Sequence, residues 1–380
     1  MNKMSWSIKQ WKDVLSIVNG KNQKEVQSDN GAYPIIGSGG EIGRANDFLC
    51  EAGSTVVGRK GTINNPFFVG ERFWNVDTAF GIQPGENLNP KFLFYFCKSY
   101  NFKKLDKSTT IPSLAKTDLL KIEMPVPSLD EQEKIVNRIE ELFSELDSAV
   151  ETLKKTKEQL VVYRQSVLKD AFEKYEFSKK VPVTDLVVNE KYALAIGPFG
   201  SNLKVSDYTA DGVRLVFVKD IRSSFSSETI KFISEKKADE LIPHCVYNGD
   251  LLITKMGDPP GDCCVYPYED RGVITSDCIR IKVDESKMNK ICLMLYILSA
   301  YGKKQVKTMT QGVAQKKISL ERFKKFCVPV IGLNEQKMLV GKIQSRLSIC
   351  DNIEKTVSDA LDQAEVMRQS VLKKAFDGGL

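Results

Sequence analysis

The chain has 380 residues, of which 42% are hydrophobic and 27% are charged, and this balance excludes a disordered or collagen-like polypeptide. Its length exceeds what one hydrophobic core ordinarily supports, so we expect two or more domains. The net charge of +6 is modest, and a single histidine, His244, argues against proton shuttles, catalytic triads and most zinc sites.

Residues 1–128 are the first predicted globule, in which short strands are separated by glycine turns. The segment YPIIGSGGEIGRAN, residues 33–46, has no counterpart later in the chain and is a candidate reading surface. The segment GSTVVGRKG predicts a strand that ends in a glycine turn carrying Arg59 and Lys60. Short strands and a later helical apolar run together indicate an α+β domain.

Residues 129–178 predict the first long helix, entered through the proline-bearing turn MPVPSLDEQ, with Asp130 as a candidate N-cap. Apolar residues recur at alternating intervals of four and three, which is the heptad pattern of a coiled coil. About 42 helical residues would extend roughly 63 Å, and such a helix could not bury its seam alone. The predicted seam is Ile135, Ile139, Leu142, Leu146, Ala149, Leu153, Thr156, Leu160, Tyr163 and Val167.

Residues 179–332 are the second predicted globule, which repeats the frame of the first with short insertions. GDLLITKMG matches GSTVVGRKG and places Lys255 opposite Arg59, and further on Asp277 falls opposite Asp77. The segment IGPFGSNLKVSDY stands where the first globule has an unrelated sequence. Two domains with the same framework and different variable surfaces are expected to recognise two different targets.

Residues 333–378 predict the second long helix, a copy of the first at an offset of 204 residues. Its turn VPVIGLNEQ offers Asn334 as a candidate N-cap, and both helices end in RQSVLK followed by a similar tail. One charge, Arg346, interrupts the second seam. The predicted seam is Leu339, Ile343, Arg346, Cys350, Ile353, Val357, Ala360, Ala364, Met367 and Val371.

The order of the elements is therefore globule, long helix, globule, long helix. Antiparallel pairing of the two helices would place the globules at opposite ends of a two-helix coiled coil, related by a pseudo-two-fold axis. Parallel pairing, or pairing with another chain, also satisfies the seam.

The residues offer little material for catalysis. No phosphate-binding GxxxxGK[ST] loop is present, because Lys60 stands where the hydroxyl residue would be. The segment GDPPGD differs from an amino-methyltransferase motif, because Gly261 occupies its aromatic position. Asp220, Glu235 and Lys237 are the residues from which a metal-dependent nuclease site would be built. The inventory favours a binding module, with a coiled-coil scaffold that binds proteins and a nuclease as alternatives.

Several segments resemble those of specificity subunits of type I restriction-modification systems. The resemblance rests on YPIIGSGGEIGRAN followed by VVGRKGTI and FWNVDTAF, on IGPFGSNLKVSDY and GDLLITKMG, and on the twice-used P-x-x-x-L-[DN]-E-Q helix ending in RQSVLK. It covers essentially the whole chain, and its repeat layout is more specific than any one motif.

The resemblance implies two target recognition domains that each read half of a split double-stranded DNA sequence and are joined by an antiparallel helical spacer within this chain. It also implies two methyltransferase subunits that carry S-adenosylmethionine, and restriction subunits that use ATP and Mg²⁺. This chain would then bind no cofactor and catalyse no step. Arg346 in the second seam, and Met256 in place of Lys60, depart from the duplicated pattern.

The candidate base-reading residues lie on the glycine turns and in the unshared segments. Arg59 and Lys60 stand on a predicted turn, where an arginine can bind guanine in the major groove; a solvated hairpin tip is the structural alternative. Lys255 takes the position of Arg59 in the second copy. The remaining candidates are Ser38, Arg44, Ser201 and Asn202.

Two lysine groups are candidates for contacts with the phosphate backbone, which position a protein on DNA without reading its sequence. These lysines are Lys103, Lys104, Lys107, Lys303, Lys304 and Lys307. Gln165 and Gln369, at the duplicated helix ends, are candidates for partner docking. The nine cysteines without C-x-x-C spacing, the lack of a secretory leader and the shortness of the apolar stretches predict a cytoplasmic protein.

Overall fold

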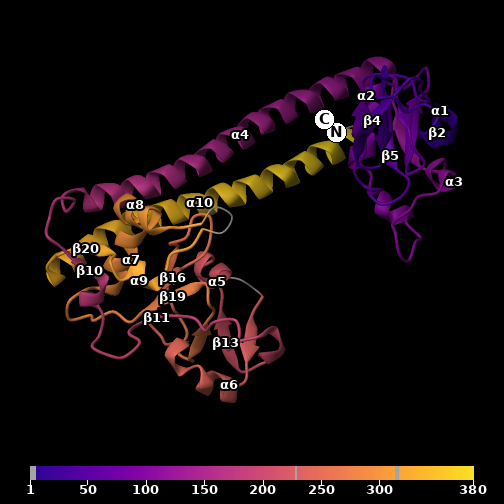
Figure 1. Ribbon diagram of the computed structural model, residues 1–380. Helices are drawn as coiled ribbons and strands as arrows, with labels where there is room; N and C mark the ends of the chain where they lie inside the picture. The colour runs from indigo at the N-terminus through magenta and orange to yellow at the C-terminus, as the bar shows by residue number, and fades with distance from the viewer. Residues whose placement is uncertain (1–5, 227–228, 313–315) are drawn as a thin grey trace. The chain divides into compact units, whose positions relative to one another are not determined.

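The computed structural model describes residues 6–226, 229–312 and 316–380. Contacts divide the chain into a first unit, Met1–Lys155 with Val357–Leu380, and a second unit, Thr156–Thr356. Each unit thus contains one globule and a segment of both long helices, α4 (Leu129–Glu173, magenta in Figure 1) and α10 (Leu333–Phe376, yellow). Within the described residues, no helix is long and apolar enough to cross a membrane.

The globule of the first unit contains three small sheets. Their strand orders are β1-β9, β2-β8-β5-β6 and β4-β3-β7, and all pairs are antiparallel except β3 with β7. The elements are β1 (Ser7–Gln10), α1 (Trp11–Val14), β2 (Leu15–Asn19), β3 (Tyr33–Gly37), β4 (Gly40–Ala45), β5 (Ser54–Gly58), β6 (Phe67–Val69), β7 (Trp74–Asn75), β8 (Ala79–Pro84), α2 (Pro90–Ser99), the 3₁₀ helix η1 (Phe102–Leu105), α3 (Lys116–Leu119) and β9 (Glu123–Val126).

Strand β5 lies in the centre of its sheet, and all five of its residues are buried. This explains why its sequence STVVG does not alternate between apolar and charged residues. Helix α2 packs beside it with Phe92, Leu93 and Phe96 buried. Asn89 fixes the start of α2, because its side chain accepts hydrogen bonds from two backbone N–H groups of the first turn. The apolar side chains of α2 thus form part of the core of this globule.

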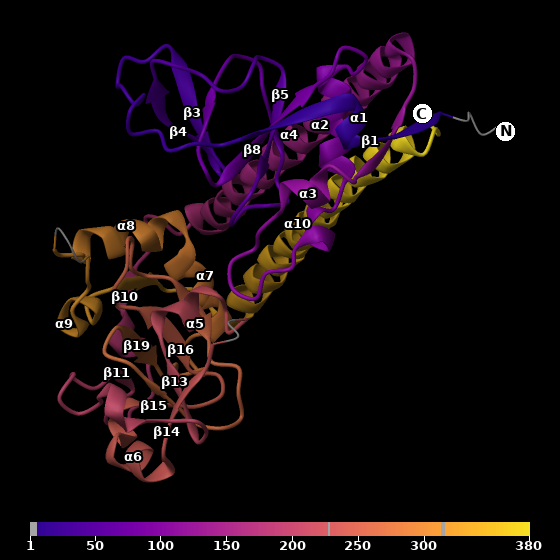
Figure 2. The same cartoon turned by 90° about the vertical axis from the view of Figure 1, so that its right-hand side faces the viewer.

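The globule of the second unit also contains three sheets, with strand orders β10-β20, β11-β19-β16-β17 and β12-β14-β13-β18-β15. Helices α8 and α6 lie at opposite ends of this globule in both Figure 1 and Figure 2. The elements are β10 (Lys180–Pro182), η2 (Val183–Leu186), β11 (Leu194–Ile196), η3 (Val205–Asp207), β12 (Tyr208–Thr209), β13 (Val213–Val216), α5 (Val218–Arg222), β14 (Lys231–Ile233), α6 (Glu235–Glu240), η4 (Ile242–His244), β15 (Cys245–Val246), β16 (Leu251–Thr254), β17 (Cys263–Val265), β18 (Gly272–Ile274), β19 (Cys278–Ile281), α7 (Lys290–Leu298), α8 (Ala300–Met309), α9 (Leu320–Phe323) and β20 (Cys327–Pro329).

The internal repeat is visible in the strand pairing. Sheet β2-β8-β5-β6 corresponds to β11-β19-β16-β17, and β1-β9 corresponds to β10-β20. Gly58 pairs with Ala79 in the first unit, and Thr254 pairs with Cys278 in the second. Because these pairs are equivalent, the residue opposite Asp277 is Thr78. The predicted match of Asp277 with Asp77 is therefore wrong by one residue, since the insertions between the copies left the sequence register open.

The long helices run antiparallel within each unit. In the first unit, Arg368 of α10 forms an ion pair with Asp147 of α4 and lies over the ring of Phe143. Nearer the globule, Ile135 and Ile139 of α4 share one apolar cluster with Leu372 and Ala375 of α10. Residues later in α10 thus contact residues earlier in α4, so the pairing in this unit is antiparallel, and both helices belong to this chain.

The second unit shows the same order. Arg164 of α4 bonds to Asp351 at 2.6 Å and to Glu354 at 2.8 Å, while Lys174, ten residues later, bonds to Glu335 at 2.7 Å. As the residue number rises along α4, its partner's number therefore falls along α10. The expected α+β class and the antiparallel pairing of the two helices are confirmed within each unit.

Four predicted seam positions are exposed, and three of them are followed by a charged residue that forms an ion pair with the other helix. Tyr163, Ile353 and Met367 are at least 40% exposed, whereas Arg164, Glu354 and Arg368 take part in the helix pairing. The fourth position is Ala149, which is followed by the less exposed Val150. The alternate seam positions stay buried late in the pattern, as at Val167 and Ala364, and the hydroxyl of Tyr163 still accepts hydrogen bonds from the guanidinium of Arg346 in α10.

Both long helices begin one residue before the predicted N-cap. Helix α4 starts at Leu129 and α10 at Leu333, so Asp130 and Asn334 lie inside the first turn. The carbonyl groups of Ser128 and Gly332 accept the first helical hydrogen bonds. The prediction that Asp130 and Asn334 cap the helices is therefore wrong. Asp130 instead adds negative charge to the first turn, where the helix dipole favours it.

Candidate nucleic-acid interface

Arg59 and Lys255 occupy the same backbone position in the two units. The N–H of Arg59 donates to the carbonyl of Thr78 at 2.7 Å, and its carbonyl accepts from Leu114 at 2.9 Å. Lys255 repeats this arrangement, donating to Asp277 at 2.7 Å and accepting from Ile318 at 3.0 Å. Each basic residue thus leaves a buried central strand, β5 or β16, at the same point. The equivalence predicted from the repeat is confirmed.

The side chains of both residues turn back toward their own unit. Guanidinium Nη1 of Arg59 lies 3.5 Å from the carbonyl of Asp77, and the group stands 5.8 Å from the centre of the Phe80 ring. The ammonium of Lys255 donates to the carbonyl of Ser276 at 3.0 Å. Both residues are half-buried, whereas Lys60 is exposed. Arg59 and Lys255 therefore keep only part of their donor capacity for a ligand.

The turn after β5 brings Ser38 close to the basic pair. Gly61 has a positive φ of +80°, and a Cβ atom placed there would lie 4.0 Å from the hydroxyl oxygen of Ser38. Ser38 belongs to the β3–β4 connection, which comes from the unshared segment. The structure thus gathers Ser38, Arg59 and Lys60 at one edge of the globule.

Arg44 has structural partners. Its guanidinium donates to the carbonyls of Gly31 at 3.1 Å and Ala32 at 2.7 Å, and it lies 3.8 Å from the carboxylate of Glu41. These bonds tie β4 to the preceding loop. Its assignment to base reading stays a prediction, although much of the guanidinium is already engaged.

Ser201 and Asn202 are exposed on the loop between β11 and η3. The hydroxyl of Ser201 lies 3.4 Å from the side-chain oxygen of Asn202, and the backbone N–H of Asn202 donates to Phe199 at 2.8 Å. The loop starts at Gly197, where a Cβ atom would be 2.0 Å from the carbonyl of Thr275. Only glycine therefore fits at the start of this loop, against the segment at Thr275 and Ser276 whose backbone also accepts a hydrogen bond from Lys255.

The two lysine groups stand on different kinds of helix. Lys103 and Lys104 lie on the four-residue 3₁₀ helix η1, whereas Lys303, Lys304 and Lys307 lie on the ten-residue α-helix α8. All five are exposed, and across the described residues none of their ammonium groups joins an ion pair. A sixth lysine, Lys107, bonds to Asp118 at 2.8 Å, and this hydrogen bond lowers the pKa of Asp118.

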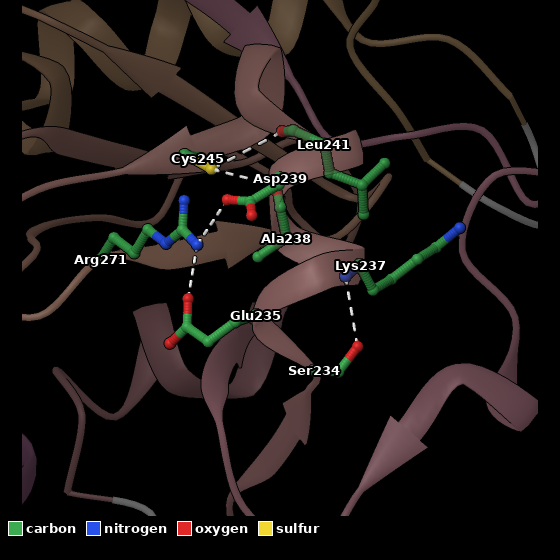
Figure 3. Close-up of polar contacts among 8 residues, drawn as sticks. All are labelled: Ser234, Glu235, Lys237, Ala238, Asp239, Leu241, Cys245 and Arg271. Atoms are coloured by element: carbon green, nitrogen blue, oxygen red, sulfur yellow. Dashed lines mark hydrogen bonds and ion pairs between the residues drawn. The ribbon is translucent and has the colours of Figure 1, made fainter.

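The residues of the alternative nuclease site do not converge. Figure 3 shows Glu235 and Asp239 of α6 directed at Arg271, while Lys237 points away from that ion pair. Lys237 bonds instead to Glu240 at 2.9 Å, and the buried Asp220 accepts a 2.8 Å hydrogen bond from its own N-cap backbone at Phe217. In residues 6–226, 229–312 and 316–380, no group of three or more His, Cys, Asp or Glu side chains could hold a metal.

Gln165 and Gln369 lie next to exposed apolar side chains that the sequence analysis did not single out. Val162 is 70% exposed and its repeat counterpart Val366 is 68% exposed. Tyr163 and Met367 follow them, also exposed. The offset of 204 residues relates both pairs, so the duplicated helix supplies the signal that would have identified them. The same apolar feature therefore occurs once in each unit.

A family model described as the type I restriction modification DNA specificity domain matches residues 4–160 and 216–363. The specificity subunit of the type I restriction enzyme EcoBI from Escherichia coli is 23% identical over 351 residues, covering 86% of this chain and 73% of that protein. The specificity subunit of the type I restriction enzyme MjaVIII from Methanocaldococcus jannaschii is 22% identical over 341 residues, covering 86% and 76%.

Two solved structures share the fold over nearly their whole length. A chain from a structure that describes complex assembly and conformational transition of the type I R-M system aligns with a TM-score of 0.75 at 15% identity, covering 99% of each chain. The HsdS subunit from Thermoanaerobacter tengcongensis aligns with a TM-score of 0.60 at 17% identity, covering 99% of this chain and 98% of that one.

Proposed function

This chain belongs to the family of type I restriction modification DNA specificity proteins, and from that premise we propose that it binds a double-stranded DNA target in two parts. The observation that carries the proposal is the shared frame of the two units. Arg59 and Lys255 leave equivalent strands through equivalent backbone hydrogen bonds, yet the segments 33–46 and 196–208 have unrelated sequences. A common frame with different loops suits two readers of two different half-sites.

The direct test is selection of bound sequences from a pool of random duplexes, with the methyltransferase partner present. We expect two short consensus blocks separated by a run of unread base pairs of fixed length. A protein-binding scaffold would retain no sequence consensus, and a single uninterrupted consensus would contradict the assignment of one half-site to each unit. Cleavage of DNA by the purified chain with Mg²⁺ alone would instead support the nuclease alternative.

The length of the unread run is proposed to depend on the long helices. Helices α4 and α10 contain 45 and 44 residues, and a helix rises about 1.5 Å per residue. Removing one heptad from each helix shortens it by about 10 Å, or roughly three base pairs of duplex. We expect the selected half-sites to stay the same while the interval between them becomes shorter. An unchanged interval would contradict a spacer role for the helices.

We also propose that two methyltransferase subunits dock on the duplicated apolar features, one on Val162 with Tyr163 and one on Val366 with Met367. Large exposed apolar side chains are costly in water, and their repetition at an offset of 204 residues suits two copies of one partner. Gln165 and Gln369 would contribute polar contacts beside them. Restriction subunits would join this assembly.

The docking proposal is tested by the stoichiometry of the complex. Val162→Glu should reduce the number of bound methyltransferase subunits from two to one, and the double variant with Val366→Glu should bind none. Val161→Glu is the matched control, because Val161 is 61% exposed but its repeat counterpart is already a glutamate, Glu365. Loss of both subunits in a single variant, or an equal loss in the control, would contradict the proposal.

In this assembly the chain itself would catalyse no step and bind no cofactor. S-adenosylmethionine would be held by the methyltransferase subunits, which methylate adenine, and ATP with Mg²⁺ by the restriction subunits. Because its proposed target is DNA, we place the protein in the cytoplasm. Adenine methylation that requires the partner, and is absent from this chain with S-adenosylmethionine alone, is the expected result.

A further inference from the structure

The second unit contains a cavity of about 530 Å³ between the β16–β17 loop and helix α8. Its volume is within the range of roughly 300–1,000 Å³ that is usual for small-molecule sites. Residues 258–262 of the loop GDPPGD line the cavity, together with Lys303, Val306 and Lys307 of α8 and with Lys316. This loop is the segment that differs from an amino-methyltransferase motif by Gly261 at the aromatic position, so the sequence assigned it no function.

The electrostatic balance of this cavity is positive. Lys316 neutralises Asp258 at 2.6 Å, and Arg222 neutralises Asp262 at 2.8 Å. Lys303 and Lys307 stand one helical turn apart on α8, and among the described residues neither joins an ion pair. Two ammonium groups are therefore available to an anion, and lysine binds phosphate as a compact point charge.

The wall beside these lysines is apolar and firmly held. Gly261 has a φ of +100°, and a Cβ atom placed there would lie 2.8 Å from a methyl group of Val306, so the loop packs directly on α8. Pro260 and Val306 are buried. The hydroxyl of Thr254 accepts hydrogen bonds of 2.9 Å from the N–H groups of Gly261 and Asp262, which fixes the loop. A planar apolar group can lie against this wall.

The first unit is built differently at the equivalent place. There the side chain of Asn64 accepts a 2.7 Å hydrogen bond from the backbone of Phe102, at the start of η1. Asn65, its neighbour, accepts a 3.2 Å hydrogen bond from Lys98. The loop is thus hydrogen-bonded to η1 and to α2, whereas in the second unit the loop contacts α8 at Gly261 and Val306 and leaves the cavity beside that contact.

We propose that this cavity binds one nucleoside phosphate, with the phosphate between Lys303 and Lys307 and the base against Pro260 and Val306. The pairing of two free ammonium groups with an apolar wall, in a volume suited to a nucleotide, is the observation that carries the proposal. The site adds to the proposed reading of DNA and does not require it. The nucleotide is either a free one from solution or a unit of a bound DNA strand.

The test is calorimetric titration of the purified full chain with ADP as the probe. We expect one site, and a loss of affinity of about tenfold or more when Lys303 and Lys307 are both changed to alanine. Lys236→Ala is the control, because Lys236 is an exposed lysine of α6 that does not line the cavity and is not among the candidate DNA contacts. A double variant that binds ADP as tightly as the control, or a wild-type chain that binds no ADP, overturns the proposal.

Duplex DNA added to the ADP-bound chain identifies the source of the nucleotide. Release of ADP, with weaker DNA binding by the double variant, assigns the cavity to a nucleotide of the strand. Retention of ADP, with unchanged DNA binding by the double variant, assigns it to a free nucleotide. A wild-type chain that binds ADP but no DNA contradicts the proposed function and leaves the cavity site standing, so the two failures are distinguishable.

Discussion

The side chain of Gln132 accepts a 2.7 Å hydrogen bond from the backbone N–H of Asn89. The amide of Gln132 also donates to the carbonyls of Asn87 and Pro127, and the residue has no exposed surface. Its repeat counterpart, Gln336, accepts a hydrogen bond of the same length from the backbone of Asn289. The glutamine of the duplicated E-Q pair thus joins the start of each long helix to the start of an apolar helix in the same unit.

Gln132→Ala should destabilise the first unit by about 1–3 kcal/mol, because it removes three part-buried hydrogen bonds, to the N–H of Asn89 and to the carbonyls of Asn87 and Pro127. Gln336→Ala should have a similar effect on the second unit. The unfolding temperature, followed by circular dichroism, reports both changes. Gln159→Ala, on the exposed face of α4, is the control and should leave it unchanged. Equal unfolding temperatures for all three variants would contradict the structural role.

Glu335 should make the stability of the second unit depend on pH. Hydrogen bonds from Lys174 and from Tyr175 hold its pKa below the usual 4.5. A group whose pKa is lowered by folding stabilises the native state above its unfolded pKa, and this contribution is lost as the pH falls through the folded value. The contribution is therefore complete at pH 7 and disappears in acid.

The measurement compares the wild type with Glu335→Gln at several pH values. The variant should unfold at a lower temperature at pH 7, and the difference should shrink below about pH 4.5. Glu158→Gln, at an exposed position of α4, should show no such convergence. A difference that stays constant down to pH 3 would mean that the carboxylate charge has no part in the effect.

The triple variant of Lys103, Lys104 and Lys107 to alanine should weaken binding to all DNA sequences alike. Phosphate contacts carry no sequence information, and each lost contact lowers the slope of log affinity against log salt by about 0.9. Affinities at several salt concentrations, together with a repeated sequence selection, measure both effects. Lys121→Ala is a control, since Lys121 is exposed and bonded to Asp118. A changed consensus would refute phosphate contact by these lysines.

Arg59→Ala should relax the preference for one half-site and leave the other unchanged. A good bidentate contact to a base contributes about 1–3 kcal/mol of discrimination. Sequence selection with the variant, analysed separately for the two consensus blocks, gives the result. Lys255→Ala should affect the other block. If both blocks stay intact in both variants, these side chains serve only to hold the strand ends at Asp77 and Ser276.

Cys327 should be the one thiol that reacts rapidly in the folded protein. It is half-exposed, whereas the other eight cysteines are buried. Burial raises the pKa of Cys50, Cys264 and Cys292 to about 12, which keeps them in the unreactive thiol form. Titration with a thiol reagent at pH 8 should show one fast equivalent that Cys327→Ser removes. Two or more fast equivalents in the wild type would contradict the packing described for the buried thiols.

The sequence predicted the repeat and both long helices, because a heptad pattern and a second copy are properties of the chain alone. The antiparallel pairing was expected from the family resemblance, since the seam by itself also allowed parallel pairing. It did not predict that Tyr163 and Met367 are exposed, because a heptad pattern gives the spacing of the side chains and not their contacts at each turn. It could not distinguish Lys103 on a 3₁₀ helix from Lys303 on an α-helix, since the local sequences are alike and the surrounding contacts decide.

The candidate site was predictable only as far as the repeat reaches. Arg59 and Lys255 were matched correctly, because each follows a recognisable strand. The bonds of Arg44 to Gly31 and Ala32 join residues 13 and 12 positions apart in the sequence, and no local sequence pattern predicts them. The cavity beside Lys303 depends on a loop that lies more than 40 residues earlier, so only the folded chain reveals it.

The apolar core of the first unit contains Leu372 and Ala375, with Phe376 against the rings of Phe92 and Phe96. These residues come from the far end of the chain, more than 270 positions after the rings they cover. During synthesis the apolar core of the first globule therefore stays incomplete, because the residues that complete it are among the last to be made. The unit that is made first is completed last, and until then its aromatic surface must be kept from other chains.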